Sequence, residues 1–269
     1  MHFPIAVITY GMPTEEDLED LLAPFQENNM GTVREEYLEF CPIDEEEVSE
    51  YNEEYETKTI ETDGQERLIK DVMSFREYMT EHIQYEYDEA SQQYGYYSNP
   101  NSRWDWYQIG GRWCAEIDVP VNCDCIIGSK SWGYENEDPY KSSDLRYKKC
   151  DGARIKSMVF PYCEEQKAKA ARFWEIYIEG ATPENEEEEK ILTDPFRYKK
   201  EYYITNFKTK ENYIRCMSSF SLYGYLKDGE WVEKDSACSD EVEWLEKFHK
   251  EVFENASNDD WITVVDCHV

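Results

Sequence analysis

The sequence has no run of about eighteen consecutive apolar residues, the length that a helix needs to cross a membrane. Its first apolar stretch, HFPIAVITYG, is too short for such a helix and lacks the preceding basic residues of a signal peptide. We therefore expect a cytoplasmic protein without a membrane partner. Because apolar residues follow one another in His2–Tyr10, we predict a central β-strand there, covered on both faces.

Basic residues are scarce. The chain has 28 Lys and Arg residues against 60 Asp and Glu residues, a formal net charge of -32. Residues 1–98 hold 26 acidic and 5 basic residues, so this region alone carries -21. A field of that sign repels phosphate backbones and attracts basic surfaces. We therefore expect no direct binding to nucleic acid, and we expect a partner protein with a basic, nucleic-acid-binding surface.

Several familiar catalytic signatures are also missing. The sequence has no P-loop, no dinucleotide-binding glycine pattern after a strand, no Gly-x-Ser-x-Gly and no His-Glu-x-x-His. These absences disfavour a familiar hydrolase or nucleotidase and predict binding without turnover and without a cofactor. The nine cysteines are odd in number and irregularly spaced, which favours reduced thiols. Four of them could be zinc ligands (Cys123, Cys125, Cys150 and Cys163), but the Cys-x-Cys spacing is unusual for zinc and we expect no metal.

The composition nevertheless predicts a folded protein, because 15% of the residues are aromatic and 22 are tyrosines. Strand and helix patterns alternate without strict βαβ order. This predicts an α+β fold with a mixed or antiparallel sheet and packed helices, with a ferredoxin-like topology as one candidate. We expect an acidic N-terminal insertion and two regions, residues 1–98 and 99–269, within one continuous globular unit.

Local patterns predict most of the individual elements. The expected helices cover Glu15–Leu22, residues 65–90, 161–179 and 241–253, and the first begins at a Thr14/Asp17 capping pair. The expected strands cover residues 154–160, 202–207 and 261–265, and a hairpin turns at residues 227–229. Residues 184–189 are expected to form an acidic linker.

The segment that differs most from the rest is residues 99–113, NPNSRWDWYQIGGRW. Its opening residues indicate a turn, and alternation on either side of Gly110 and Gly111 predicts a bulged β-hairpin whose second strand runs to Val119. Its tryptophans would then belong to the core. Alternatively, a polar cluster around a glycine gap would bind an anion or a planar ring, with these ligand-binding residues: Arg103, Asp105, Tyr107, Gly110, Gly111, Arg112 and Trp113. A third interpretation is an Arg–Asp network without a ligand.

A second candidate site lies in residues 31–64, where carboxylates alternate with aromatic residues. One interpretation is a solvated, partly helical insertion. The other is a partner-binding face with carboxylates at phosphate-like spacing and tyrosines for contact area. The residues predicted for that face are Glu45, Glu46, Glu47, Tyr51, Glu53, Glu54 and Tyr55.

Four blocks carry a resemblance to a protein family. They read LAPFQEN (residues 22–28), NPNSRWDWYQIGGRW (99–113), DGEW (228–231) and VDCHV (265–269). In these blocks the chain resembles a largely uncharacterised family of proteins from phages, prophages and mobile elements. Relatives tend to have lysine where Arg103 stands and a Gly/Trp-rich segment where this chain has residues 233–240. The resemblance implies a mobile-element origin and a host-cell cytoplasm, and it implies no particular activity.

Charge and resemblance together suggest an inhibitor of host defence, with a CRISPR effector as one candidate target. In this hypothesis the protein acts like an anti-CRISPR, and acidic residues of 35–56 and 184–189 occupy a nucleic-acid channel of that target as a DNA mimic would. The alternative is a binding protein or an enzyme for a nucleotide-like anion, with its site at residues 103–113. A structural accessory protein remains a third possibility.

Overall fold

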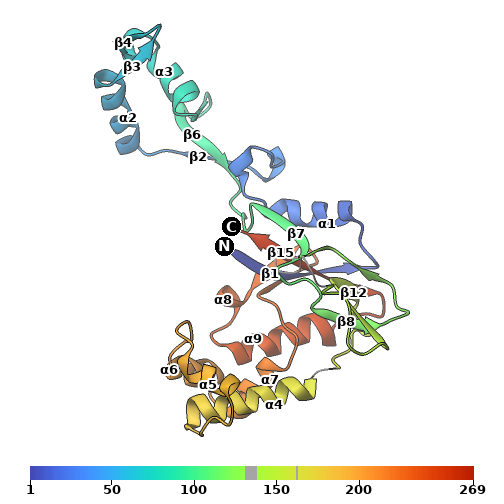
Figure 1. Cartoon of the computed structure of the whole chain (residues 1–269). Coiled ribbons are helices and arrows are strands. Elements are labelled where there is room, and N and C mark those ends of the chain that lie inside the picture. The colour runs from blue at the N-terminus through green and yellow to red at the C-terminus, as the bar shows by residue number, and fades with distance from the viewer. Residues whose placement is uncertain (131–137, 162) are drawn as a thin grey trace. The chain divides into compact units, whose positions relative to one another are not determined.

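The strand β1 (His2–Tyr10) is the centre of the main sheet in the computed structural model, which describes residues 1–130, 138–161 and 163–269. It pairs antiparallel with β15 (Asp260–His268) along its whole length and parallel with β13 (Gly224–Lys227). Residues 5–7 are fully buried, as expected for a strand covered on both faces. The prediction of a central strand is confirmed, and the pairing brings both termini to the same end of the β1–β15 strand pair (Figure 1).

The chain forms two compact units, which we describe separately. Unit 1 consists of Met1–Glu19 and Trp106–Val269, and unit 2 consists of Asp20–Asp105. The acidic region is therefore an insertion into unit 1, and its ends lie at residues 20 and 105 instead of at a boundary after residue 98. The helix α1 (Glu15–Leu22) begins in unit 1 and ends in unit 2. Hydrogen bonds between Thr14 and Asp17 cap its start, as the sequence predicts.

Unit 1 has an eight-stranded mixed sheet with a main strand order of β10-β7-β15-β1-β13-β14, to which β12 and β9 are added. Within the described residues, the other strands of unit 1 are β7 (Trp106–Gly111), β8 (Ile117–Pro120), β9 (Cys125–Ile126), β10 (Ser129–Lys130), β11 (Tyr147–Cys150), β12 (Gly152–Arg154) and β14 (Glu230–Glu233). Of these, β8 and β11 form a separate two-stranded sheet. The remaining helices of unit 1 are α4 (Cys163–Trp174), α5 (Glu186–Thr193), α6 (Lys200–Phe207), α7 (Lys210–Met217), α8 (Lys234–Ala237) and α9 (Glu241–Phe248). The predicted α+β class is therefore confirmed, whereas a ferredoxin-like topology is not.

The helix α9 packs its apolar side on one face of this sheet. Trp244 and Phe248 are buried with Ile8 of β1 and Ile262 of β15 in one hydrophobic cluster. The helix continues as a π-helical turn to Glu254, so the prediction of a helix over residues 241–253 is confirmed. The predicted hairpin is also confirmed, as β13 and β14 joined at Asp228 and Gly229.

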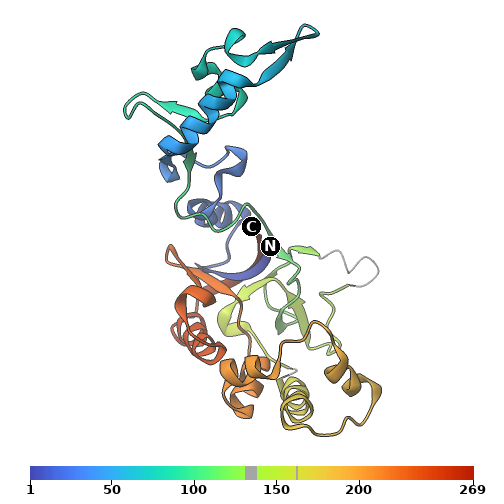
Figure 2. The ribbon, with the colours of Figure 1, turned by 90° about the vertical axis from the view of Figure 1, so that its left-hand side faces the viewer.

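Helices α4, α5, α6 and α7 gather in a separate layer of unit 1 (Figures 1 and 2). Trp174, Phe207 and Tyr213 form its small aromatic core. The predicted strand over residues 202–207 is wrong, because this segment is the helix α6. Its aromatic residues favour a strand locally, but Tyr203 and Phe207, four residues apart, stack together on one helix face at 6.2 Å.

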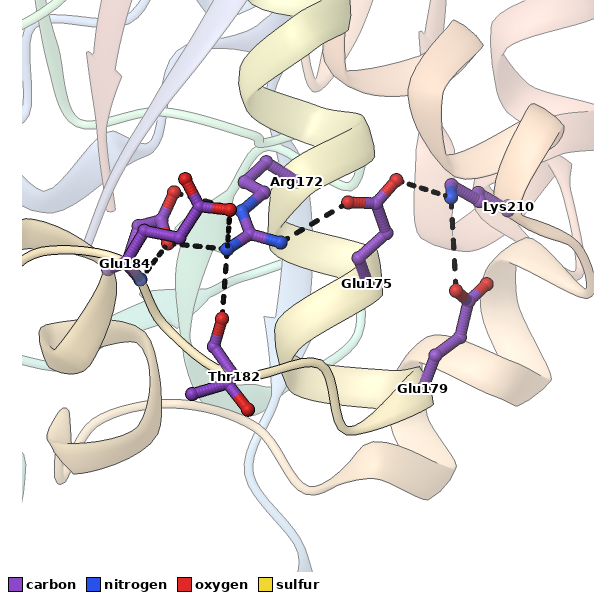
Figure 3. Close-up of polar contacts among 7 residues, drawn as sticks. Arg172, Glu175, Glu179, Thr182, Glu184 and Lys210 are labelled. Carbon is purple, nitrogen blue, oxygen red and sulfur yellow. Dashed lines mark hydrogen bonds and ion pairs between the residues drawn. The ribbon is translucent and has the colours of Figure 1, made fainter.

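An ion-pair network joins three of these helices (Figure 3). Arg172 of α4 pairs with Glu188 of α5 at 2.8 Å, and Lys210 of α7 pairs with Glu175, in the π-helical extension of α4, at 2.9 Å. The arginine holds the pKa of the Glu188 carboxyl below its ordinary value. The predicted acidic linker over residues 184–189 instead contains the start of α5, which begins at Glu186 after Asn185 caps it by accepting a hydrogen bond from the backbone N–H of Glu188.

The predicted strand over residues 154–160 is also wrong. Only Arg154 belongs to β12, and Ile155–Ser157 form a 3-10 turn. By contrast, the predicted helix over residues 161–179 is confirmed from Cys163 onward, as α4 and its π-helical extension Glu175–Glu179, whereas residue 162 lies outside the described residues. None of the helices in the described ranges combines the length and the apolar character needed to span a bilayer.

Unit 2 consists of short strands, one long helix and single helical turns. Its elements are β2 (Glu39–Pro42), α2 (Glu45–Thr57), β3 (Thr59–Thr62), β4 (Gln65–Leu68), α3 (Phe75–Glu77), β5 (Glu86–Asp88) and β6 (Gln93–Ser98). The predicted long helix over residues 65–90 is wrong. Asp63 and Gly64 both have positive φ and close a two-residue β3–β4 hairpin, the turn that an Asp-Gly pair favours.

Candidate functional site

The helix α2 contains all seven residues predicted for a partner-binding face. It follows Asp44, whose carboxylate caps the helix by accepting a hydrogen bond from the backbone N–H of Glu47 at 2.8 Å. Its first turn holds Glu45, Glu46 and Glu47, where negative charge interacts favourably with the positive end of the helix dipole. The same carboxylates therefore stabilise the helix that presents them.

Tyr51 and Tyr55, which were predicted to supply contact area for a partner, are half-buried and pack α2 against the rest of unit 2. The two residues are four apart, so they share one face of the helix. The Tyr51 ring lies 5.8 Å from that of Tyr85, and the Tyr55 ring lies 5.4 Å from that of Phe75. Both tyrosines pack against the small core of unit 2 and fix the direction in which the opposite face points.

Glu47 and Glu54 flank this inward face and accept hydrogen bonds from the half-buried Tyr85 and the buried Tyr78. The hydroxyl of Tyr85 donates to Glu47 at 2.6 Å, and that of Tyr78 donates to Glu54 at 2.9 Å. Burial and the Glu54 carboxylate raise the pKa of Tyr78 to about 12. These two glutamates are thus partly occupied within unit 2.

The outward face of α2, called the acidic face below, carries four exposed glutamates: Glu45, Glu46, Glu50 and Glu53. Basic residues near the ends of the helix pair elsewhere, Lys58 with Glu54 and Lys70 with Glu56. Within the described residues, no ion pair neutralises any of the four exposed carboxylates. The acidic face is therefore a row of uncompensated, hydrated charges.

A groove of about 460 Å³ runs along this helix. Its lining consists of five acidic residues and one tyrosine: Asp44, Glu46, Glu47, Glu50, Tyr51 and Glu54. A lysine or arginine side chain entering it would meet several carboxylates at once, which favours a basic partner over a neutral one.

The acidic charge of residues 184–189 is compensated in part. Arg172 contacts Glu184 at 3.4 Å and Glu188 at 2.8 Å, so two of these charges are compensated within unit 1 (Figure 3). The other three glutamates, Glu186, Glu187 and Glu189, are exposed, and the part of this segment in binding a partner stays a prediction.

The second candidate site, residues 103–113, is divided between the two units. Arg103 and Asp105 belong to unit 2, and Tyr107, Gly110, Gly111, Arg112 and Trp113 belong to unit 1. Trp104 is a core residue of unit 2: it is buried, and its indole N–H donates to the carbonyl oxygen of Leu22 at 3.1 Å. Trp106, by contrast, is 42% exposed, so the tryptophans do not share one core.

The predicted hairpin in this segment is wrong. The strand β7 pairs with β15 and β10, whereas β8 pairs with β11. Gly110 and Gly111 do adopt positive φ, at 75° and 56°. They lead into a turn over residues 112–115 and not directly into a returning strand.

The two glycines are required by two buried carboxylates. A Cβ on Gly110 would lie 2.7 Å from Cγ of Asp151, and a Cβ on Gly111 would overlap the carboxylate of Asp266. Both aspartates are 0% exposed. The expected gap is therefore filled, and an anion placed there would be repelled by two negative charges.

Asp266 links two of the blocks that carry the family resemblance. Its carboxylate accepts hydrogen bonds from the backbone N–H of Arg112 at 2.9 Å and from Nε2 of Gln108 at 3.3 Å. It also bonds to Nδ1 of His2 at 2.8 Å. Since β7 and β15 pair directly, IGGRW and VDCHV are adjacent parts of one structural core.

Tyr107 and Trp113 line different pockets of unit 1. Tyr107 faces α1 in a pocket of about 500 Å³, where burial and the charge of Glu19 raise its pKa. Trp113 lines a pocket of about 320 Å³ near the start of α4. The structure therefore does not gather the unit 1 members of the predicted cluster around one ligand.

Comparisons with protein-family models, with curated proteins and with solved structures found no match for this chain. What the two units bind is therefore inferred from their own geometry and charge. The acidic face has uncompensated charge and a groove, whereas the space beside Gly110 and Gly111 is closed.

Arg112→Ala is expected to change the free energy of unfolding by less than about 0.5 kcal/mol. The Arg112 side chain is exposed, and its backbone N–H, which alanine retains, makes the bond to Asp266. Thermal unfolding of the purified protein measures the change. A loss of more than about 2 kcal/mol would show that the guanidinium group is part of the core.

The four cysteines considered as zinc ligands are free thiols. Cys150 is buried, and Cys123, Cys125 and Cys163 are half-buried. Burial raises the pKa of the Cys150 thiol, and nearby Cys125 adds to this effect. In the described parts of the chain, no group of three or more His, Cys, Asp or Glu side chains is arranged to hold a metal ion.

Sequence reasoning missed three buried aspartates, Asp118, Asp151 and Asp266. Asp118 gave a usable signal, because it alternates with Ile117 and Val119 and therefore had to face away from their core. Asp151 and Asp266 gave none, because their partners lie far away in the sequence.

Proposed function

We propose that the protein binds a basic, nucleic-acid-binding surface of another protein through the acidic face of α2. The observation that carries this proposal is the row of four exposed glutamates without an ion-pair partner among the described residues. Unit 2 as a whole has 23 acidic and 6 basic residues, a formal net charge of -17. Such a surface attracts cationic partners and repels free nucleic acid.

The charge density of α2 supports mimicry of a nucleic-acid strand. The helix has 13 residues and therefore a length of about 20 Å at 1.5 Å per residue. The four glutamates of the acidic face lie between Glu45 and Glu53, a rise of about 12 Å, so successive charges are about 4 Å apart along the axis. Phosphates are about 3.4 Å apart along each strand of B-DNA. A groove that binds a phosphate backbone would meet a similar linear charge on this helix.

The inward face of α2 supports the proposal in a second way. Packing of Tyr51 and Tyr55, together with the tyrosine bonds to Glu47 and Glu54, fixes the helix before any partner arrives. A preorganised surface loses less conformational entropy on binding than a flexible acidic tail does. Affinity can then come from a limited number of charge pairs.

The resemblance to phage and mobile-element proteins suggests which partner to test. We propose that the target is a nucleic-acid-binding component of host defence, and a CRISPR effector is the first candidate. In that case the protein would compete with guide or target nucleic acid for a basic channel.

Replacing Glu45, Glu46, Glu50 and Glu53 together with glutamine should abolish partner capture while leaving unit 2 folded. The four side chains are exposed and unpaired in the described chain, so their loss changes charge without opening the core. The wild type should retain a basic host protein from lysate at about 50 mM salt and release it at about 500 mM, where screening is strong. Mass spectrometry and circular dichroism provide the two readouts.

A matched variant controls for the general loss of negative charge. Glu201, Glu211, Glu230 and Glu254 are exposed glutamates of unit 1, and changing all four to glutamine removes the same total charge. This control variant should capture the same partner as the wild type. Equal capture by both quadruple variants and the wild type would contradict the proposal.

A further inference from the structure

A pocket of about 320 Å³ in unit 1 lies between β8, the start of α4 and the segment that follows α7. Glu116 and Asp118 line one side, and Cys163 and Gln166 of α4 line another. Residues 217–223 complete the wall. The residues that line this pocket all belong to unit 1, so the pocket is independent of the acidic face.

Asp118 places a buried carboxylate in this pocket. Ile117 and Val119 are fully buried in the core, so alternation along β8 turns Asp118 to the other side. Asp118 is only 9% exposed, yet none of the described residues donates a hydrogen bond to its Oδ1. Lys149 lies at 4.0 Å from Oδ2, beyond hydrogen-bond distance, and donates to the carbonyl oxygen of Ala115 instead.

A second carboxylate strengthens the negative potential of the pocket. Glu116 precedes Asp118 by two residues and faces the same side, where solvent still reaches its side chain. The surrounding protein raises the pKa of Glu116 by removing part of its hydration, and Lys149 opposes this shift. Two carboxylates beside one ammonium group leave a net negative charge.

The rest of the lining suits the stem of an organic cation. The Ser218 hydroxyl donates to the carbonyl oxygen of Ile214 at 2.7 Å, so its own oxygen remains an acceptor. Trp113 and Phe220 supply aromatic surface to the same pocket. Aromatic rings beside carboxylates favour a cation with an apolar stem over a small hydrated ion.

We propose that this pocket binds a guanidinium or alkylammonium group on a short apolar stem. The charged group would donate to the unpartnered Oδ1 of Asp118 and to Glu116, and the stem would pack beside Trp113. An anion is disfavoured by both carboxylates. A bound cation would give the buried Asp118 oxygen the hydrogen-bond donor that it lacks in the described chain.

The same chemistry can come from a free amine or from an arginine side chain of a protein. The probes are therefore agmatine, N-acetyl-arginine methylamide, and N-acetyl-citrulline methylamide as the uncharged analogue of nearly equal shape. Calorimetric titration at about 150 mM salt suppresses weak adsorption to the acidic surface. Saturable binding of one arginine or agmatine molecule, without binding of citrulline, is the expected result.

Asp118→Asn should weaken that binding at least tenfold, because the amide carries no charge and places a donor where an acceptor is needed. Asp124→Asn is the matched control, since Asp124 is exposed in the same unit and its loss changes the net charge equally. Glu116→Gln serves as a second pocket variant and should weaken binding severalfold. Tighter binding of N-acetyl-arginine methylamide would indicate a protein ligand, and tighter binding of agmatine would indicate a free amine.

Asp118→Asn should also raise the Tm at neutral pH, which separates a binding role from a structural one. Burial raises the pKa of Asp118, so its charged form disfavours the folded state as pH rises through that pKa. The gain should shrink as pH falls and disappear below about pH 3, where the carboxyl is protonated in both the folded and the unfolded state. Glu116 and Cys163 line the same pocket and Lys149 lies at 4.0 Å from Asp118. All three are present in both proteins, so their contributions largely cancel.

Two outcomes would overturn the proposal. One is the absence of saturable binding of either cation by the wild type. The other is equal affinity of the Asp118→Asn and Asp124→Asn proteins, which would place the bound cation elsewhere on the acidic surface. If Asp118→Asn does not fold, equal affinity of Glu116→Gln and the wild type overturns it as well. Neither outcome bears on the acidic face of unit 2.

Discussion

Gly111→Ala is expected to lower the free energy of unfolding of unit 1 by about 3 kcal/mol or more. An alanine at φ 56° costs about 1 kcal/mol in backbone strain alone. Its Cβ would also overlap the Asp266 carboxylate and approach Nε2 of Gln108 to 2.6 Å. Moving Asp266 away would weaken its buried hydrogen bonds to Arg112 and His2, at about 1–3 kcal/mol for a donor left unsatisfied.

Gly180→Ala is the control for backbone strain. Gly180 also has positive φ, at 83°, but a Cβ there would meet nothing within 4 Å. This variant should therefore lose only about 1 kcal/mol. Urea unfolding followed by tryptophan fluorescence compares the two variants. Equal losses would mean that the close approach to Asp266 contributes nothing.

Asp151→Ala should cost about 3–5 kcal/mol, the second large effect. The buried carboxylate accepts hydrogen bonds from the backbone N–H groups of Ala115 at 2.7 Å and Gly128 at 2.6 Å. It accepts a third from the hydroxyl of Tyr140 at 2.8 Å. Alanine would remove the acceptor of three donors from three distant segments of unit 1, and among the described residues only the Tyr140 hydroxyl has another acceptor nearby, the carbonyl oxygen of Ser129 at 3.4 Å.

Asp151→Asn separates hydrogen bonding from volume. The amide has nearly the same size but keeps a single acceptor oxygen, so at least one donor loses its partner. We expect an intermediate loss of about 2 kcal/mol. Asp124→Ala, at an exposed position, should change stability by less than about 0.5 kcal/mol. A loss below about 1 kcal/mol for Asp151→Ala would show that the three donors find other partners.

The elements that were predicted correctly have local causes. Continuous apolar residues identified β1 and the core of β15, the Thr14/Asp17 pair marked the start of α1, and an Asp-Gly pair marked the β13–β14 turn. The Asp63-Gly64 turn carried the same signal immediately before the segment predicted as a long helix. Helical spacing of apolar residues was given too much weight there.

The incorrect predictions have causes that are distant in the sequence. The helix α6 forms because its rings pack on α4 and α7, which overrides their preference for a strand. The double glycine was interpreted as the centre of a hairpin, but its partners are Asp151 and Asp266. These residues come from β15 and from the junction of β11 with β12, and no local pattern connects them to β7.

The candidate site could be predicted only in part. The acidic composition and helical character of α2 were visible, and so were the exposed charges at Glu45, Glu46 and Glu53. The packing of Tyr51 and Tyr55 on the core of unit 2 was missed, although their spacing from each other and from Val48 indicates an inward stripe. Among the described residues, the acidic face has no ion pairs, because Lys58 and Lys70 pair with Glu54 and Glu56 instead. Composition alone does not predict these pairings.

Competition with nucleic acid tests the central claim most directly. A host protein captured by the wild type is bound to a fluorescent DNA or RNA duplex, and the anisotropy of the duplex is followed while this protein is added. The account predicts that the wild type and the unit 1 control variant displace the duplex, and that the acidic-face variant does not. Simultaneous binding of the duplex and the wild type would contradict mimicry of a nucleic-acid strand.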